Sequence, residues 1–365
     1  MRRIGITTTI PTEVLLAAGY NPVDLNNLFI GDPDPEHLVR IAENVGFPQN
    51  CCTWIKGIYG ACHEKGIDDV LCVTTGDCSN TIMLMEVLKL KGHRVLPFAY
   101  PDIPNVHRMH HALETLAKSL GTDIAATESA RDDLLPCRRQ CLNLDRLTWK
   151  EDLISGWENH LWLVTSSDFS GDYHGYCSQI GHFIDHSRTR QPFSPDMLRL
   201  AYIGVPSIFA RSLYPFIEHT GARVVFNETQ RQFSMPHTGS CLAEQYSHYT
   251  YPYSIFHRLD DILPELKRRH VDGVIHYVQA FCHRAIADII FRQNIDLPIL
   301  TLESNDSYVL TEHHRTRIEA FLDVVRHRHR IRPDRIPAKK EERNDDKDRH
   351  KRLRTHRAAR FQSNP

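Results

Sequence analysis

Cysteines stand at three places where a strand or turn should give way to a helix. The stretch "QNCCTWIKGIYG" holds Cys51 and Cys52, "VTTGDCSNT" holds Cys78, and "VQAFCHRAIADII" holds Cys282. The N–H groups at a helix N-terminus stabilise a thiolate, so we expect these positions to lower the pKa of their cysteines. Thiols of this kind could bind a metal or act as nucleophiles.

The residues around these cysteines favour a metal cluster over zinc or a cysteine nucleophile. Structural zinc sites usually contain paired C-x-x-C motifs, whereas this chain has only a C-x-x-x-C at Cys137 and Cys141. The cysteine–histidine neighbours at 62–63 and 282–283 cannot form dyads within a helix, because adjacent side chains point about 100° apart. Three thiolates from separate elements suit a [4Fe–4S] cluster that leaves one iron for an external ligand.

Three other cysteines and a histidine-rich stretch are expected to have no role in the site. Cys72 lies inside an apolar strand pattern, and Cys177 and Cys241 have no cysteine at a metal-binding spacing. Cysteine is among the most buried residue types, so we interpret these three as packing residues. The "HRMHH" stretch at 107–111 has helical spacing without a carboxylate or thiol to complete a metal site, which favours a surface helix face.

Three segments repeat the order strand, helix, strand: residues 68–101, 198–229 and 271–306. In the first segment the pattern predicts a strand at 70–75, a helix at 80–91 closed by Gly92, and a strand at 94–99. Such units form parallel sheets covered by helices on both faces. Ligands of these sheets bind beyond the carboxyl ends of the strands, where Cys78 and Cys282 stand.

We therefore predict an α/β fold with two Rossmann- or flavodoxin-like parallel-sheet domains, a helical middle segment and a basic tail. The predicted boundaries are an N-terminal α/β domain at 1–120, a helical connecting segment at 121–194, a C-terminal α/β domain at 195–325 and a tail at 326–365.

The composition is that of a globular protein with a charged extension. Of the 365 residues, 41% are hydrophobic and 24% charged. No apolar run reaches 18 residues, and the N-terminus is a poor signal-peptide core, so we expect a cytoplasmic protein with no membrane segment. Its ten cysteines are then better interpreted as thiols or ligands than as disulfides.

Charge is distributed unevenly along the chain. Residues 326–365 hold 15 Lys and Arg against 6 Asp and Glu, a balance of +9, which leaves 29 basic and 39 acidic residues before them. With few apolar residues to bury, the tail is predicted to be disordered. It has one aromatic residue and no nucleic-acid motif, so a nucleic-acid partner is not expected.

Four stretches in order resemble one protein family. They are "TTTIPTEVLLAAGYNPVDL", "CTWIKGIYG", "DDVLCVTTGDCSNTIMLMEVL" and "VDGVIHYVQAFCHRAIADIIFRQNIDLPILTLESND". Together they resemble the 2-hydroxyacyl-CoA dehydratase D-component family, which includes benzoyl-CoA reductase subunits. The resemblance covers most of residues 4–325 and excludes the tail.

The resemblance implies a [4Fe–4S] cluster held by three cysteines between α/β domains, which here would be Cys52, Cys78 and Cys282. Cys52 has Lys56 four residues on and Gly60 eight residues on, as in the family, whereas Cys51 is out of step by one. Cys51 is then a packing neighbour.

The same resemblance implies an activity and its partners. An ATP-driven iron–sulfur activator acting in trans would supply one electron, and the cluster would use it to dehydrate an acyl-CoA thioester through a ketyl radical. We expect a homo- or heterodimer with a paralogous subunit. The alternatives are a benzoyl-CoA reductase-like or double-cubane-type reductase subunit, and a non-enzymatic metal-stabilised scaffold with a nucleic-acid-binding tail.

Four further residues are candidates for the substrate side of the site. The resemblance implies that Thr8, Glu13 and Asn21 lie near the substrate, since the N-terminal signature does so in the family. Glu13 could instead offset the dipole of a helix that starts after Pro11. His63 could donate a proton or could be a solvated helical residue.

Overall fold

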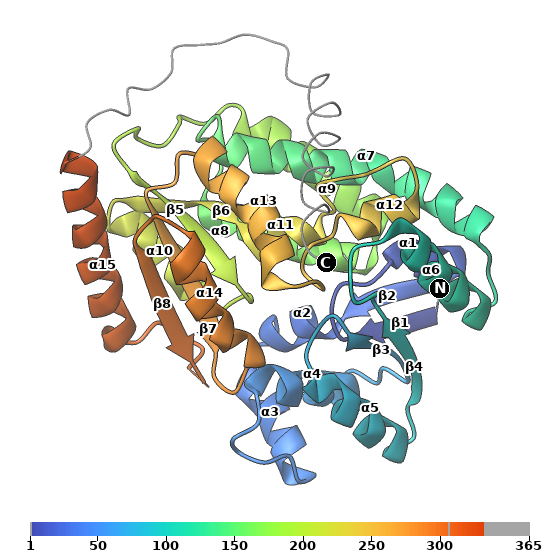
Figure 1. Ribbon diagram of the computed structural model, residues 1–365. Helices are drawn as coiled ribbons and strands as arrows, with labels where there is room; N and C mark the ends of the chain where they lie inside the picture. Colours follow the sequence, from blue (N-terminus) through green and yellow to red (C-terminus); the bar gives the residue numbers. More distant parts are fainter. Residues whose placement is uncertain (1, 306, 332–365) are drawn as a thin grey trace, which may run out of the picture. The chain divides into compact units, whose positions relative to one another are not determined.

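Two four-stranded parallel sheets, one in each half of the chain, form the framework of the protein (Figure 1). The computed structural model describes residues 2–305 and 307–331. The strands are β1 (Arg2–Ile6), β2 (Tyr20–Asp24), β3 (Asp69–Thr75), β4 (Arg94–Ala99), β5 (Leu198–Gly204), β6 (Ala222–Asn227), β7 (Gly273–Gln279) and β8 (Ile299–Ser304).

The two sheets have equivalent strand orders. The first is β2-β1-β3-β4 and the second is β6-β5-β7-β8, with every pair parallel. The strand order therefore reverses between β1 and β3 and between β5 and β7, as in flavodoxin-like sheets. This arrangement confirms the predicted α/β fold with two parallel sheets. It also sets two places, beyond the carboxyl ends of these strand pairs, where ligands of such sheets bind.

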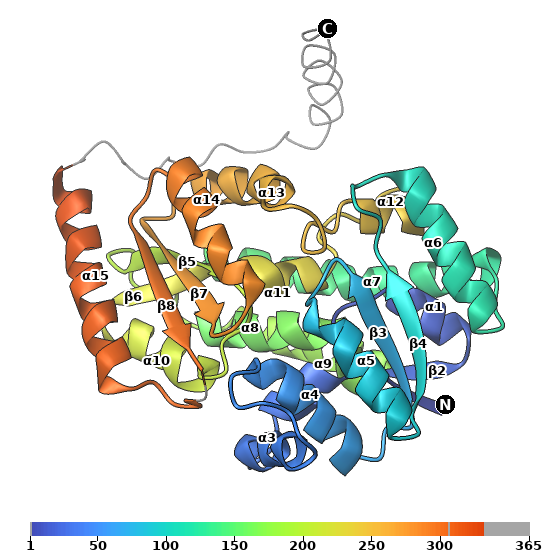
Figure 2. The same cartoon turned by 60° about the horizontal axis from the view of Figure 1, so that its bottom comes forward.

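Helices cover both sheets. Along β3, Val70 and Cys72 belong to one buried apolar cluster, while Leu71 and Val73 belong to another, as alternating strand side chains should. The first cluster packs under α4 and α5 and the second under α6 and α12, which lie on opposite sides of the first sheet in Figure 2. Burial of both faces explains why the inner strands β3, β5 and β7 are largely apolar.

The helices follow the strand order along the chain. They are α1 (Thr12–Ala17), α2 (Leu25–Ile30), α3 (Pro35–Asn44), α4 (Thr53–Glu64), α5 (Asn80–Leu90), α6 (Val106–Ser119), α7 (Ile124–Trp149), α8 (Gly156–Val164), α9 (Tyr173–Ser187), α10 (Ala210–His219), α11 (Glu228–Phe233), α12 (Leu242–Ser247), α13 (Ile255–Arg268), α14 (Ala287–Asn294) and α15 (Glu312–Ile331). Three short 3₁₀ turns are η1 (Thr165–Ser167), η2 (Phe169–Gly171) and η3 (His283–Ile286). The predicted helical middle segment is confirmed by α7, α8 and α9.

One apolar cluster joins both halves of the chain. Phe29 and Leu38, from α2 and α3, belong to the same buried cluster as Leu213 and Leu310 of the second half. The Phe29 ring lies 6.1 Å from that of Tyr308 in an edge-to-face contact. Residues 1–326 accordingly form one compact unit, and the proposed division at 120 and 194 stays a prediction.

The end of the described chain is helical. Helix α15 continues to Ile331 and so includes the first six residues of the predicted tail. The rest of that tail, residues 332–365, lies outside the described residues, and its predicted disorder stays a prediction. No helix within residues 2–305 and 307–331 is both long and apolar enough to cross a lipid bilayer.

Two buried carboxyl groups meet at the carboxyl end of β2. The Asp24 N–H donates to Asp168 Oδ2 at 2.7 Å, and Ser167 Oγ donates to Asp24 Oδ2 at 2.6 Å. Burial raises the pKa of both carboxyls, and the neighbouring Asp24 charge helps raise the pKa of Asp168 to about 7. The folded chain therefore holds a proton here more tightly than the unfolded chain, whose Asp pKa is about 3.9.

Replacing Asp168 with Asn should flatten part of the pH dependence of stability. Between about pH 4 and pH 7 the folded state binds the extra proton, so this carboxyl makes stability fall as pH rises through that window and level off above it. The wild-type minus Asp168→Asn difference in unfolding free energy, from urea titrations, should decrease over the same window.

The matched control is Asp185→Asn, which removes a carboxylate whose side chain is 72% exposed on α9. It should leave the pH dependence as in the wild type. Parallel stability curves for wild type and Asp168→Asn would contradict the conclusion that the folded chain binds a proton at this carboxyl pair more tightly than the unfolded chain does.

Candidate functional site

The loop that carries Cys78 requires a glycine. After β3 ends at Thr75, Gly76 has a φ of +98°, and a Cβ there would lie 2.6 Å from the Cβ of Pro252. Glycine thus permits both the left-handed turn and the close approach to a segment distant in sequence. The next residue, Asp77, accepts a hydrogen bond from the Tyr251 hydroxyl at 3.2 Å.

The loop that carries Cys282 is strained just before the cysteine. Phe281 has a φ of +64°, which is unfavourable for a bulky side chain and is typical of functional loops. Cys282 donates its N–H to the Gln279 carbonyl at 3.1 Å and caps the 3₁₀ turn η3. The sequence predicted an α-helix from 282, but α14 begins at Ala287, after this tighter turn.

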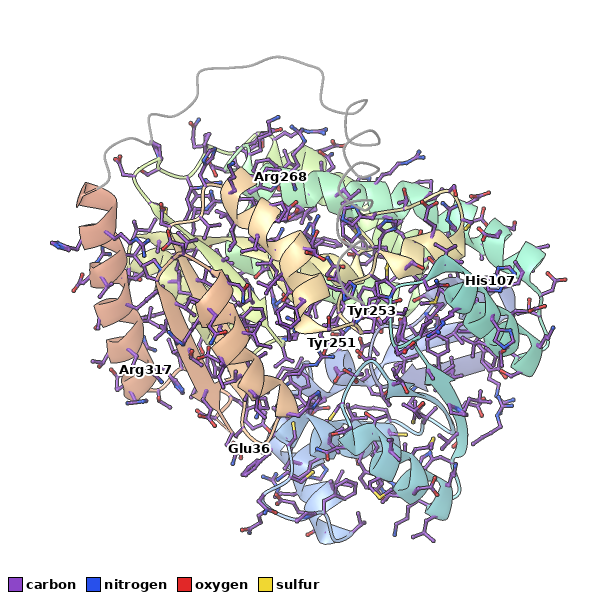
Figure 3. All side chains as sticks on the ribbon, in the orientation of Figure 1. Glu36, His107, Tyr251, Tyr253, Arg268 and Arg317 are labelled. Atoms are coloured by element: carbon purple, nitrogen blue, oxygen red, sulfur yellow. The ribbon has the colours of Figure 1, made fainter. Side chains whose placement is uncertain are left out.

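Arg284 joins the two cysteine loops. Its Nη2 donates to the Gly76 carbonyl at 3.1 Å and to the Tyr251 carbonyl at 3.3 Å, and its guanidinium lies 4.4 Å from the Tyr251 ring centroid. Tyr251 and Tyr253 are both buried, and Figure 3 shows them in the middle of the view, between the helices of the two halves. The segment 249–253 therefore bridges the loop after β3 and the loop after β7.

Cys52 is attached to the second sheet through the residue that follows it. Thr53 Oγ1 donates to the Asn305 carbonyl at 2.7 Å, and the same carbonyl accepts Gln279 Nε2 at 2.6 Å. Asn305 follows β8, and Gln279 ends β7. The N-terminus of α4, with Cys52 as its N-cap, is thereby held beside the loop of Cys282.

The three predicted ligands lie close enough for their charges to interact. Cys52 interacts electrostatically with Cys282, and Cys78 interacts with both. Among the described residues, no three or more His, Cys, Asp or Glu side chains surround a position for a single metal ion. Thiolates of an iron–sulfur cluster bind different irons, so the ligands of a [4Fe–4S] cluster need not converge on one point.

Burial dominates the acidity of these thiols. It raises the pKa of Cys52 to about 11 and that of Cys78 to about 12, and it also raises the pKa of Cys282. The backbone amides of residues 54, 55, 80 and 284 lower these pKa values and so oppose the rise. The prediction that helix N-termini lower these pKa values is therefore wrong in its net sign, because desolvation outweighs the N–H donors.

This donor set fits a [4Fe–4S] cluster. Three cysteines from three loops act on one another electrostatically, and nearby backbone amides favour the thiolate form of each, as they do for cluster ligands. Arg284 adds a positive charge next to Cys282. We therefore retain the assignment of these residues as proposed ligands.

Lys56 and Gly60 dock α4 against its neighbours. Lys56 is 4% exposed, and its Nζ donates to Glu43 Oε1 at 2.7 Å and to the Gln49 carbonyl at 3.3 Å. A Cβ at Gly60 would lie 2.0 Å from the Leu38 carbonyl oxygen of α3, so only glycine allows this helix contact. The family spacing after Cys52 thus corresponds to residues that fix where the helix starts.

Glu13 lies in a buried ion pair. It is fully buried, and its carboxylate accepts Arg138 Nη2 at 2.6 Å, Gln245 Nε2 at 3.0 Å and the Tyr246 hydroxyl at 2.8 Å. Burial raises its pKa, but the Arg138 charge and these hydrogen bonds more than offset that effect and leave the pKa lowered. The geometry gives Glu13 a structural role in joining α1, α7 and α12, and a catalytic role stays a prediction.

The other predicted substrate-side residues are separated in the fold. Thr8 is buried just past the carboxyl end of β1, whereas Asn21 lies within β2, near Gly171. His63 is exposed in the last turn of α4, stacked on Tyr59. Eleven residues of helix place it about 16 Å along the axis from Cys52.

Sequence reasoning missed a histidine that lines the same recess as Cys282. The recess is formed by residues of β7 and its following loop, including His276, Cys282 and Arg284. His276 is 2% exposed, and its Nδ1 lies 2.7 Å from Asp288 Oδ1. A polar residue within the apolar strand pattern "GVIHYVQ" was the available signal.

A glycine makes room for this histidine. Gly204 ends β5 with a φ of +99°, and a Cβ there would lie 2.2 Å from the Tyr277 carbonyl oxygen and 3.1 Å from His276 Cδ2. The recess therefore depends on glycine at the carboxyl end of β5. This is the strand pair, β5 and β7, at which the strand order of the second sheet reverses.

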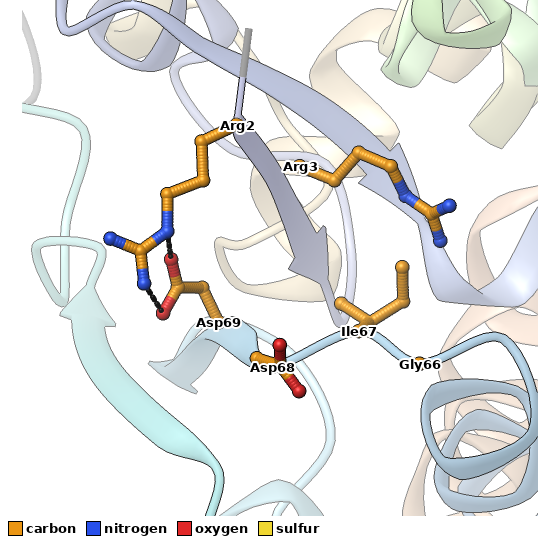
Figure 4. A pocket seen from close by; sticks show the side chains of 6 residues that line it. All are labelled: Arg2, Arg3, Gly66, Ile67, Asp68 and Asp69. Atoms are coloured by element: carbon orange, nitrogen blue, oxygen red, sulfur yellow. Dashed lines mark hydrogen bonds and ion pairs between the residues drawn. The ribbon is translucent and has the colours of Figure 1, made fainter.

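A second pocket lies at the other end of the strands of the first sheet, away from their carboxyl ends. It is lined by Arg2, Arg3 and residues 66–69, at the amino ends of β1 and β3 (Figure 4). Arg2 Nε pairs with Asp69 Oδ2 at 2.6 Å. Because ligands of parallel sheets bind at the carboxyl ends, this pocket is a poor candidate for the active site.

Arg284→Met should destabilise the protein by about 1.5–3 kcal/mol, because it removes charged hydrogen bonds to two carbonyls while keeping an apolar stem. The free energy of unfolding from urea titration measures the change.

The control is Arg292→Met on α14, whose side chain is 47% exposed. Its effect should stay below about 1 kcal/mol. Equal effects of the two substitutions would show that Arg284 is not the link between the cysteine loops.

Residues 7–325 match the family model described as 2-hydroxyglutaryl-CoA dehydratase, D-component. The matched span includes Cys52, Cys78, Cys282 and every strand except β1. None of the curated proteins matches the chain. Since the family model covers well over half of the sequence, the chain belongs to the 2-hydroxyglutaryl-CoA dehydratase D-component family.

Proposed function

We propose that the chain is the iron–sulfur subunit of a 2-hydroxyacyl-CoA dehydratase. In this proposal Cys52, Cys78 and Cys282 hold a [4Fe–4S] cluster, and the reaction removes water from a 2-hydroxyacyl-CoA thioester. The observation that supports the proposal is that these three thiols act on one another electrostatically where Arg284 joins the cysteine loops of both sheets. Membership of the dehydratase family supports the reaction class.

When bound, the cluster would supply one strongly reducing electron to the thioester carbonyl, which allows dehydration through a ketyl radical. The partners in this proposal are an ATP-driven iron–sulfur activator that delivers the electron and a paralogous subunit that forms a dimer. The protein itself would orient the thioester and exclude water from the reacting carbonyl.

The residues of the recess suit a substrate that gains negative charge. Arg284 borders the recess with a positive charge, whereas Arg258 there is neutralised by Glu228 through hydrogen bonds of 2.9 and 2.6 Å. We assign to Arg284 the stabilisation of the reduced thioester oxygen. We assign proton transfer to the departing hydroxide to His276, oriented by Asp288.

Single replacements of the cysteines should distinguish the proposed cluster ligands from the adjacent cysteine that does not bind the cluster. Cys52→Ser, Cys78→Ser and Cys282→Ser should each lose the visible absorption of the anaerobically purified protein and most of about four irons per chain. Cys51→Ser is the matched control and should keep both. Iron and acid-labile sulfide assays check the result.

Two outcomes would contradict the ligand assignment. If Cys51→Ser loses the visible absorption and Cys52→Ser keeps it, the ligand is Cys51 and not Cys52. A colourless protein that binds zinc instead of iron would exclude the cluster and favour the scaffold alternative.

Two histidine variants test the proton donor. With 2-hydroxyacyl-CoA thioesters and a reduced activator, His276→Gln should lower turnover about 10²- to 10⁴-fold while iron content stays unchanged. His63→Gln should leave turnover unchanged, because that side chain is exposed at the far end of α4. The reverse result would support the proton-donor role first predicted for His63.

The same assay distinguishes the alternative function: a reduced product without loss of water would identify a reductase.

A further inference from the structure

A chain of hydrogen bonds extends from His276 to the surface of α14. His276, on β7, and Thr301, on β8, are register partners in neighbouring parallel strands, so their side chains leave the sheet on the same face. Helix α14 covers this face, where the Phe291 ring packs edge-to-face on His276 with centroids 4.9 Å apart. Asp288 of the same helix contacts both strands: its Oδ1 lies 2.7 Å from His276 Nδ1 and accepts the Thr301 hydroxyl at 2.6 Å.

Arg292 is the outer end of this chain. It follows Asp288 by four residues on α14, so the two side chains are neighbours on one face of the helix. Its Nε donates to Asp288 Oδ2 at 2.6 Å, and its Nη2 donates to Thr301 Oγ1 at 2.6 Å. The guanidinium therefore holds the carboxylate and the hydroxyl in one fixed fork, although 47% of its side chain is exposed.

These contacts set the direction of the hydrogen bond between Asp288 and His276. Burial raises the pKa of Asp288, but the hydrogen bonds from its three partners outweigh burial and leave that pKa lowered. An ionised carboxylate only accepts hydrogen bonds, so His276 Nδ1 must be the donor. Nδ1 then carries a proton in both charge states of the ring, and Nε2 is the nitrogen that gains and loses one.

Nε2 belongs to the edge of the ring that lies toward the recess. The ring atom bonded to it, Cδ2, lies 3.1 Å from the position of a Cβ at Gly204, which lines the recess together with Cys282 and Arg284. Nδ1 lies on the opposite edge, against Asp288. A proton exchanged at Nε2 would therefore be available to a thioester in the recess, whereas the proton on Nδ1 would not.

We propose that Thr301 and Arg292 are positioning residues for the proposed dehydration. They hold Asp288 in place, Asp288 keeps the His276 proton on Nδ1, and His276 then transfers protons at Nε2. Thr301 and Arg292 lie behind the carboxylate as seen from His276, so each acts through Asp288. The inference rests on the proposed function, because His276 acts on a substrate only in that reaction.

The tautomer of His276 can be measured without substrate or turnover. In ¹⁵N NMR of the full chain with labelled histidines, His276 is the one signal among 23 histidines that His276→Gln removes. At about pH 8, above the ordinary pKa of histidine, this signal should show the proton on Nδ1. Thr301→Val and Arg292→Met should each populate the Nε2–H tautomer as well, because Asp288 is no longer held against the ring.

Arg317→Met is the matched control for both variants. Arg317, labelled in Figure 3, donates to the Thr301 backbone carbonyl at 2.7 Å, so it contacts the same residue without joining the chain to Asp288. This variant should keep the wild-type tautomer. A wild-type His276 without a proton on Nδ1 would overturn the inference, as would an unchanged tautomer in Thr301→Val or Arg292→Met.

Turnover of a 2-hydroxyacyl-CoA thioester with reduced activator gives the second test. Thr301→Val and Arg292→Met should lower kcat about 10- to 100-fold through misplacement of His276, while KM and iron content stay unchanged. Thr301→Ser keeps the hydroxyl and should retain most of the wild-type kcat. An unchanged kcat in Thr301→Val, or an equal loss in Thr301→Ser, would overturn positioning by the hydroxyl. If the wild-type chain dehydrates no thioester, the proposed function fails, and the NMR result alone decides whether the two residues fix the tautomer.

Discussion

The candidate site depends on one hydrogen-bonded junction. Arg284 places its guanidinium on the Gly76 and Tyr251 carbonyls and on the Tyr251 ring, so that a loop from each sheet meets the segment 249–253. Each sheet alone supplies only one strand-to-loop cysteine, and neither could bind a cluster by itself. Because the junction uses backbone carbonyls, it fixes loop positions rather than side-chain rotamers, which is what the three proposed ligands on separate loops would require.

Within this junction, two opposing effects set the state of the thiols. N–H groups at helix and turn starts favour thiolates, yet burial raises the thiol pKa values above their ordinary range. The same burial that disfavours free thiolates gives a bound cluster a water-poor environment, where N–H donors act more strongly on charge. A thiolate metal site of this kind adds stability only to the state that assembles it, because the metal must displace the thiol protons.

The sequence predicted what local patterns determine. The strand and helix around Cys78 were placed to within one residue, since β3, α5 and β4 each have a clear period and the helix ends at a glycine. The contacts that assemble the site were missed. Tyr251 reaches Asp77 across 174 residues, and no periodicity marks a bridging loop. His276 pairs with Asp288 only 12 residues on, but strand periodicity does not show which polar side chain faces a helix. Glu13 was predicted from the family resemblance, with a helix-dipole role as the alternative, and neither can show that Arg138 pairs with it.

The register of the adjacent cysteines follows from how α4 is docked. Lys56 is held by Glu43 and the Gln49 carbonyl, and Gly60 touches the α3 backbone, so the helix cannot slide by one residue without a clash. With α4 fixed, Cys52 is the N-cap and the first amides of the helix lower the pKa of its thiol, whereas Cys51 precedes the cap. In the motif Cys-x-x-x-Lys-x-x-x-Gly, the lysine and the glycine therefore fix the position of the helix. That position determines which of the two neighbouring thiols faces the junction.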